Sequence, residues 1–209
     1  MSIQMHPPTP LFRDSYDSHY MVHRLSQTLY STLLNKHDFY DIVIVCIGTD
    51  RSTGDALGPI IGSKLSSLTP ANMSVYGTLD EPVHAMNLDD TLQQIKENHR
   101  FPLIIAIDAC LGDLKSVGKI TLAKGPLKPG AGVQKKLPEV GDYHLTGIVN
   151  VGGFMEYFVL QNTRLSVVMK MADKITTAIH TTSTLLAQKK EASPTESFNR
   201  RWSNVFTDQ

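Results

Sequence analysis

Residues 42–59 read IVIVCIGTDRSTGDALGP, and this stretch decides the fold of the chain. An apolar, β-branched run over 42–47 breaks into a polar, glycine-rich loop, and the pair Gly58-Pro59 then begins a helix. The pattern predicts strand, loop, helix. In parallel α/β sheets, ligands bind at the carboxyl ends of the strands, where such loops lie. This loop carries Asp50 and Asp55, which favours acid chemistry or the binding of a cation.

Outward from this stretch, strand and helix patterns alternate along the chain, which predicts an α/β sheet with crossover helices. Further strands are expected at 73–78, 103–107 and 119–123, with a short one near 165–168. Helices are expected at 17–35, 58–67, 87–98, from about 146 past Tyr157, and at 167–186. Residues 124–145 are rich in glycine and proline and predict a long loop of the kind that is often functional.

The pattern predicts a single domain with looser ends. We expect a flexible N-terminal arm over 1–16, one α/β domain over 17–188 and a mobile C-terminal tail over 189–209.

Composition excludes several classes of function. The chain of 209 residues has 20 basic and 20 acidic residues, so no basic field attracts nucleic acid or an anionic membrane. No apolar stretch reaches the ~18–20 residues that span a bilayer, and residues 1–8 lack the pattern of a secretory signal. Cys46 and Cys110 lie in apolar runs, as reduced thiols do. We therefore expect a cytoplasmic protein without nucleic-acid or membrane partners.

Three residues are the candidates for chemistry. Asp55 lies in the first loop, Asp108 ends the buried run at 103–107, and His144 precedes a predicted helix. If these loops leave the same edge of a sheet, two carboxylates can share a proton and act as general acid and general base. Two carboxylates and an imidazole also suit a divalent metal. The residues alone favour neither reading.

Each candidate also has a structural interpretation. Asp55 can cap the following helix, Asp108 can bind loop amides, and His144 can be a solvated loop histidine. Asp50 fits turn chemistry better than catalysis. A cysteine hydrolase that uses Cys110 with His144 as base is a more distant alternative, because a buried cysteine is usually inert.

Other sites are disfavoured by spacing. The glycines at 48, 54 and 58 have neither dinucleotide-binding nor P-loop spacing. Ser52 lacks the nucleophile elbow of hydrolases, and His19 with His23 has no acidic partner in the same pattern.

The motifs resemble those of known peptidases. Residues 48–59 are similar to the first motif of the bacterial spore germination protease, which ends in Thr-x-Asp-Ala-Leu-Gly-Pro. The run 107–109, Ile-Asp-Ala, resembles its second motif. Both also resemble motifs of the nickel-hydrogenase maturation endopeptidases, and Tyr143-His144 and Gly77-Thr78 are similar to their metal-contacting histidine and cleft segment. Over about 40–185, in length and motif order, the chain most resembles the YyaC-type sporulation proteins.

The resemblance implies a three-layer α/β/α fold of the phosphorylase/hydrolase type, like that of the hydrogenase maturation proteases, with a mostly parallel central sheet. It implies that Asp55 and Asp108 are catalytic and that His144 and Thr78 are candidates to contact substrate or metal. The metal ligands would be Asp55, Asp108 and His144. The resemblance implies no definite cofactor, and a divalent metal stays an option.

Two functions follow as hypotheses. The first is a sporulation-associated endopeptidase that hydrolyses a peptide or protein substrate with its carboxylate pair, in the cytoplasm of the sporulating cell or spore. The second is a non-catalytic protein that binds metal or peptide in the same acidic cleft. Assembly into a homo-oligomer is left open.

Overall fold

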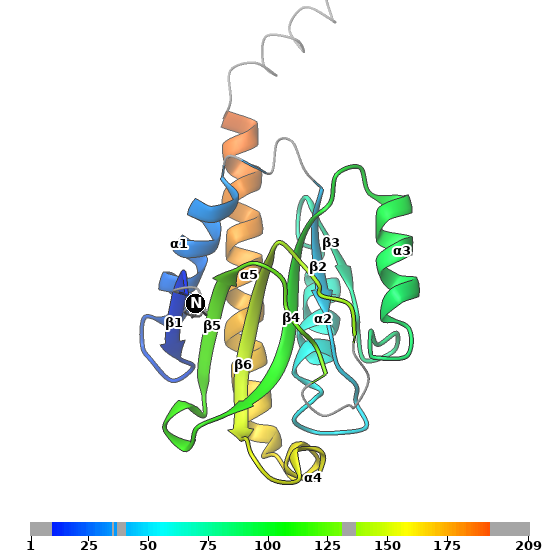
Figure 1. Ribbon diagram of the computed structural model, residues 1–209. Helices are drawn as coiled ribbons and strands as arrows, with labels where there is room; N and C mark the ends of the chain where they lie inside the picture. The colour runs from blue at the N-terminus through cyan, green and yellow to red at the C-terminus, as the bar shows by residue number, and fades with distance from the viewer. Residues whose placement is uncertain (1–9, 35, 37–40, 131–136, 193–209) are drawn as a thin grey trace, which may run out of the picture.

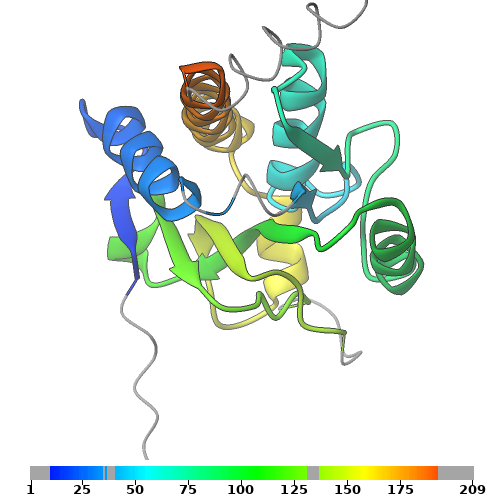
Figure 2. The same ribbon diagram turned by 90° about the horizontal axis from the view of Figure 1, so that it is seen from above.

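The computed structural model of the protein describes residues 10–34, 36, 41–130 and 137–192. Its centre is a six-stranded sheet with the order β1-β5-β6-β4-β2-β3 (Figures 1 and 2). The strands are β1 (Phe12–Ser15), β2 (Ile42–Cys46), β3 (Met73–Tyr76), β4 (Leu103–Gly112), β5 (Lys119–Lys124) and β6 (Tyr143–Val151).

The sheet is mostly parallel. β2 pairs in parallel with β3 and β4, and β4 pairs in parallel with β6. β5 pairs antiparallel with both β6 and β1, so β5 alone runs against the other strands of the sheet. The carboxyl ends of β2, β3, β4 and β6 therefore lie at one edge, and of these strands the sequence pattern predicted β2, β3 and β4.

Helices cover both faces of the sheet (Figure 2). On one face, α1 (Met21–Leu33), α2 (Leu57–Leu68) and α5 (Leu165–Ala192) bury the larger hydrophobic core. On the other face, α3 (Leu88–Asn98) packs with a smaller core that includes Val43, Val45 and Ala106. The short helices are the 3₁₀ turn η1 (Leu114–Ser116) and α4 (Glu156–Gln161). This arrangement confirms the expected α/β fold with helices on both sides of its sheet. No helix among the described residues has the length and apolarity needed to cross a membrane.

Glycines bring α2 close to the sheet. A Cβ atom on Gly62 would lie 1.8 Å from the carbonyl oxygen of Gly77, and one on Gly58 would lie 2.1 Å from that of Ile47. Contacts this short exclude any side chain at these positions. The start of α2 is thereby held against the end of β2, which fixes the path of the loop between them.

Two predicted elements are wrong. Residues from about 146 were expected to form a helix, but β6 occupies 143–151 and only α4 follows as a helix. A short alternation was present in the sequence before Gly147, where Tyr143 and Leu145 alternate with His144 and Thr146, and in the structure the first two are buried while the other two are half-buried. A period of two is typical of a strand, and β6 lies between β4 and β5. The short strand expected near 165–168 is instead the first turn of α5.

The expected ends of the domain also differ from the structure. The arm predicted over 1–16 contains β1, because Phe12 is buried in the core and the strand pairs with β5. In the tail predicted over 189–209, α5 continues to Ala192. Residues 1–9 and 193–209 lie outside the described part of the chain.

Candidate active site

A pocket of about 280 Å³ lies at the carboxyl-end edge of the sheet, and both Asp55 and Asp108 line it. β2 ends at Cys46, which pairs with Ile107 of β4, so Asp108 is the first residue of β4 beyond its partner strand. Asp108 thus lies inside the longer strand β4 rather than at its end, on the side where the loop after β2 begins. The structure brings the two predicted catalytic acids into one pocket.

The loop after β2 holds Asp55 in place through close backbone contacts. Gly48 has a φ of 138°, and a Cβ atom there would lie 2.0 Å from the carbonyl oxygen of Asp55. Only glycine allows this conformation and approach. The residue that precedes α2 is Ala56, so Asp55 does not occupy the N-cap position of that helix. The interpretation of Asp55 as a helix cap is therefore not supported.

The two carboxyl groups affect each other's ionisation. Burial raises the pKa of Asp108 well above its ordinary value, and the negative charge of Asp55 raises it further. The backbone N–H of Ala109 donates to Asp108 at 2.8 Å and opposes this shift. Burial also raises the pKa of Asp55, against the opposing effects of the Thr49 backbone N–H and of His84. The pair therefore retains a proton to higher pH than isolated carboxyls, and the deeper Asp108 is the favoured holder.

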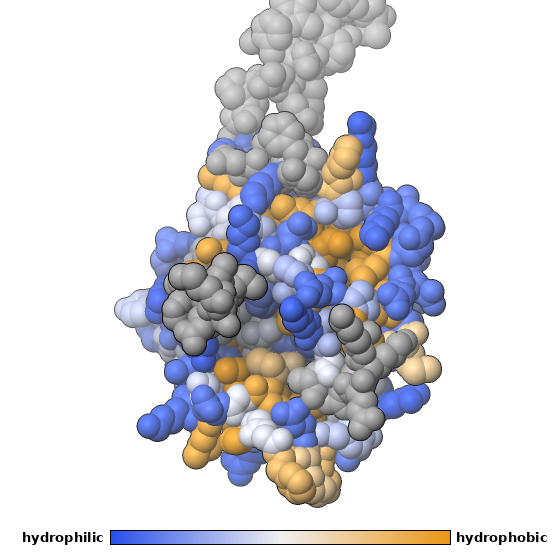
Figure 3. Space-filling model, in the orientation of Figure 1, coloured by the Kyte–Doolittle hydropathy of each residue, from blue (hydrophilic) through white to orange (hydrophobic). Residues whose placement is uncertain are grey.

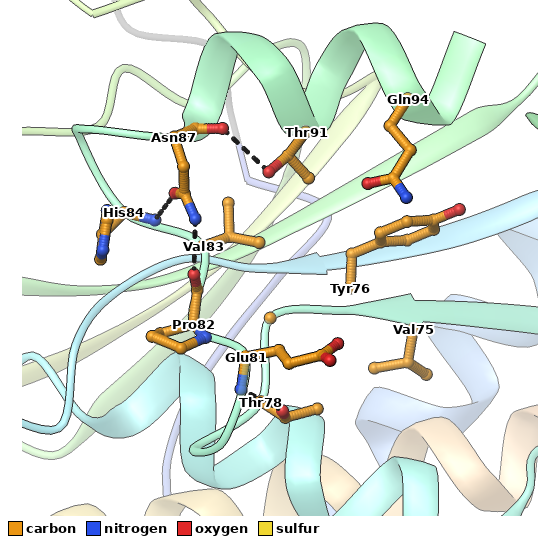
Figure 4. A pocket seen from close by; sticks show the side chains of 11 residues that line it. Val75, Tyr76, Thr78, Glu81, Pro82, Val83, His84, Asn87, Thr91 and Gln94 are labelled. Carbon is orange, nitrogen blue, oxygen red and sulfur yellow. Dashed lines mark hydrogen bonds between the residues drawn. The ribbon is translucent and has the colours of Figure 1, made fainter. Parts of the chain in front are cut away.

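His84 is a residue of the pocket that the sequence did not identify. It lines the pocket with the two acids, and its charge acts on the pKa of Asp55. Its backbone N–H donates to Oδ1 of Asn87 at 2.8 Å, while Nδ2 of Asn87 donates to the carbonyl of Pro82 at 2.9 Å (Figure 4). The backbone N–H of Met86 donates to Nδ1 of His84, so a neutral His84 ring carries its proton on Nε2. Its only sequence signal was its place after β3, in a segment that resembles a peptidase cleft.

Thr78 lies in a different pocket. It lines a second cavity, of about 380 Å³, together with Tyr76, Glu81 and Asn87 (Figure 4). His84 lines both cavities, so they share one wall.

His144 does not join the two acids. It lies in β6 opposite Ala106, and its Nδ1 donates to the carbonyl of Gly125 at 2.9 Å. It is absent from the lining of the acidic pocket. Within the described ranges, no group of three or more His, Cys, Asp or Glu side chains is placed to hold a metal ion. The set expected from the sequence, Asp55, Asp108 and His144, therefore does not fit a three-ligand metal site.

The remaining candidates are also placed by the structure. Cys110 lines the pocket, but burial and the charge of Asp108 raise its pKa to about 11, so it is a thiol rather than a nucleophilic thiolate at neutral pH. His144 is engaged elsewhere and cannot serve as its base in this arrangement. Asp50 is exposed, and its Oδ1 accepts a hydrogen bond from Oγ1 of Thr49 at 3.4 Å, as expected for a turn residue.

Comparison with known proteins assigns the chain to a family. Residues 13–178 match the model of a family described as "Protein of unknown function (DUF1256)". The chain belongs to the DUF1256 family. This DUF1256 chain is 53% identical over 175 residues to the protein YyaC of Bacillus subtilis (strain 168), a match that covers 84% of this chain and 85% of the relative. The similarity to YyaC-type proteins expected from the motifs is thus confirmed.

A solved structure is also similar to this DUF1256 chain. It is the crystal structure of HycI, a NiFe hydrogenase maturation protease from Thermococcus kodakarensis KOD1. The TM-score is 0.48 at 14% sequence identity, and the match covers 73% of this chain and 99% of the other.

Proposed function

We propose that this protein is an endopeptidase that hydrolyses a peptide bond with Asp55 and Asp108, and that it acts during sporulation in the cytoplasm of the sporulating cell or spore. The observation that carries the catalytic part is that the half-buried Asp55 and the buried Asp108 line one pocket, where the charge of Asp55 raises the pKa of Asp108. The motifs at 48–59 and 107–109, which resemble those of the spore germination protease, support the reaction class and the biological setting.

The geometry suits a division of roles between an acid and a base. Asp55, the less buried and more readily ionised group, takes a proton from the attacking water. Asp108 donates its proton to the oxygen of the scissile carbonyl as the tetrahedral intermediate forms. Collapse of the intermediate breaks the C–N bond, and the amine leaves with the proton that Asp55 accepted. The carbonyl bond re-forms at the same time, and the hydroxyl that Asp108 had protonated returns its proton to Asp108, so both carboxyls regain their starting forms. His84, beside Asp55, helps to keep that carboxylate ionised.

The test uses a mixture of peptides prepared by digestion of a whole proteome. Incubation with the full chain is expected to create new N-termini, counted by mass spectrometry. Asp55→Asn and Asp108→Asn should each slow their appearance by about 10²-fold or more, because each removes one proton-transfer group. Asp50→Asn is the matched control, since Asp50 lies in the same loop and is exposed. Thermal unfolding of each variant verifies that it is folded.

Cleavage by either pocket variant at the wild-type rate would show that the pair is not catalytic.

A second function, non-catalytic peptide binding, is favoured by one observation, namely that most of the other residues lining the pocket are apolar. It predicts that the wild type binds peptides from the mixture without creating new termini.

A further inference from the structure

Apolar side chains from three separate segments form the walls around the acid pair. Met86 comes from the loop after β3, Leu111 from the end of β4, and Tyr157 and Leu160 from α4. Met86 is 87% exposed and Tyr157 is 63% exposed, so large apolar surfaces stand at the mouth of the pocket and face solvent. Single exposed apolar side chains are common, but several of them together around a pocket are typical of a binding site.

Exposed apolar side chains also lie on α4 and directly before it, a set called the α4 surface here. Phe154, Met155 and Phe158 are all exposed, and they flank Tyr157 in the sequence. Figure 3 shows hydrophobic atoms gathered at the end of the molecule where α4 lies. Tyr157 lines the pocket and is itself a residue of α4, so the pocket wall adjoins this exposed segment.

The charges and the size of the pocket restrict what can enter it. Apart from the acid pair, the titratable or charged groups of its lining are Arg51, His84, the protonated Cys110 and the phenol of Tyr157. The volume of about 280 Å³ is close to the lower end of the range for ligand pockets, about 300 Å³, which suits a small group such as one large side chain. A charged side chain would be desolvated against apolar walls at a high cost, and an acidic one would also face Asp55.

We propose that this pocket selects a polypeptide segment by one large apolar side chain, such as leucine or phenylalanine, and that the neighbouring residues of the segment lie on the α4 surface. Met86 and Tyr157 then determine specificity. The inference rests on the proposed function, because it names the substrate class of the same site.

Binding is measured apart from cleavage. Five fluorescein-labelled peptides with the sequence Ala-Ala-Xaa-Ala-Ala, in which Xaa is Leu, Phe, Ala, Lys or Glu, are titrated with the full-length Asp108→Asn variant and followed by fluorescence anisotropy. The Leu and Phe peptides are expected to bind about tenfold or more tightly than the other three, the range that differences in apolar contact provide. Equal binding of all five, tighter binding of Lys or Glu, or binding of none would overturn the proposal.

Matched substitutions test whether Met86 is responsible for the binding of the Leu peptide. Met86→Asp in the same background should weaken binding of the Leu peptide by about tenfold, whereas Met86→Leu should preserve it. Leu114→Asp is the control, because Leu114 is also a highly exposed apolar residue but does not line the pocket. Equal effects of the two aspartate substitutions would overturn the assignment of Met86.

The same peptides separate this inference from the proposed catalysis. If wild-type protein prefers the Leu and Phe peptides but never cleaves peptides, the selection stands and the endopeptidase function fails. If it creates new termini without a preference for apolar residues beside the cut, catalysis stands and the selection fails.

Discussion

The two pocket carboxyls differ because they come from different kinds of structure. Asp108 lies within a strand whose surroundings exclude water, and the N–H of Ala109 is its hydrogen-bond partner. Asp55 lies in a loop near His84. Both residues were predicted from their positions after apolar runs, but a sequence does not contain the burial that separates their pKa values. That difference arises only when the strand and the loop meet.

Asp108 should make stability depend on pH. Because its folded pKa lies above the ordinary 3.8, the folded protein binds the proton more tightly than the unfolded chain, and the free energy of unfolding falls as pH rises between the two values. A one-proton difference corresponds to about 1.4 kcal/mol per pH unit in that window. Asp108→Asn, whose amide oxygen can still accept from Ala109, should remove this fall and be more stable than wild type above the window.

Urea unfolding at pH 3, 5, 7 and 9 measures the effect. The advantage of Asp108→Asn over the wild type should be smallest at pH 3, where the Asp108 carboxyl of the wild type is protonated in both the folded and the unfolded chain. Asp50→Asn, at an exposed position, should follow the wild-type profile. Parallel profiles for Asp108→Asn and the wild type would contradict the raised pKa.

At the scale of the element, β1 and β6 are the two strands that the sequence did not identify. Both lie on the side of the sheet where β5 reverses direction. β1 is only four residues long, and the alternation in β6 is interrupted by Gly147, whose Cβ would lie 2.6 Å from Leu57 Cδ2. Strands whose own residues give a weak or interrupted pattern are defined by their neighbours more than by their own sequence.

Substitution of Phe12 tests whether β1 is part of the folded domain. Phe12 is 5% exposed, and the guanidinium of Arg24 from α1 lies 5.7 Å from the centre of its ring. Phe12→Ala should lower the free energy of unfolding by about 3 kcal/mol, as for other buried aromatic residues. Leu11→Ala, at the exposed neighbouring position, should change it by less than about 0.5 kcal/mol. Equally small changes in the free energy of unfolding for Phe12→Ala and Leu11→Ala would show that β1 does not contribute to the folded domain.

At the scale of the whole molecule, a single sheet joins two hydrophobic cores. Ile175 of α5 is buried in the larger core and Ile95 of α3 in the smaller one, and neither is exposed to solvent. β2 contributes to both, since Ile44 packs in the larger core and Val45 in the smaller. Loss of either core would therefore expose one face of the same strand.

This sharing predicts a single cooperative unfolding transition. Ile175→Ala and Ile95→Ala should each cost about 2–5 kcal/mol, and each should shift the same transition to lower temperature. Far-ultraviolet circular dichroism and calorimetry should give coincident midpoints for both variants. A variant that splits the transition into two would show that the faces unfold separately.

The sequence by itself determined the strand-loop-helix unit at 42–59, the parallel strands β2 and β4, and the choice of Asp55 and Asp108. Runs of β-branched residues, a Gly-Pro helix start and acids after buried strands are local signals, and local signals are what a sequence contains. The tertiary structure decided which side chains meet. It placed His84 beside Asp55 and kept His144 bound to Gly125, because strand register and loop closure set distances between residues that lie far apart along the chain.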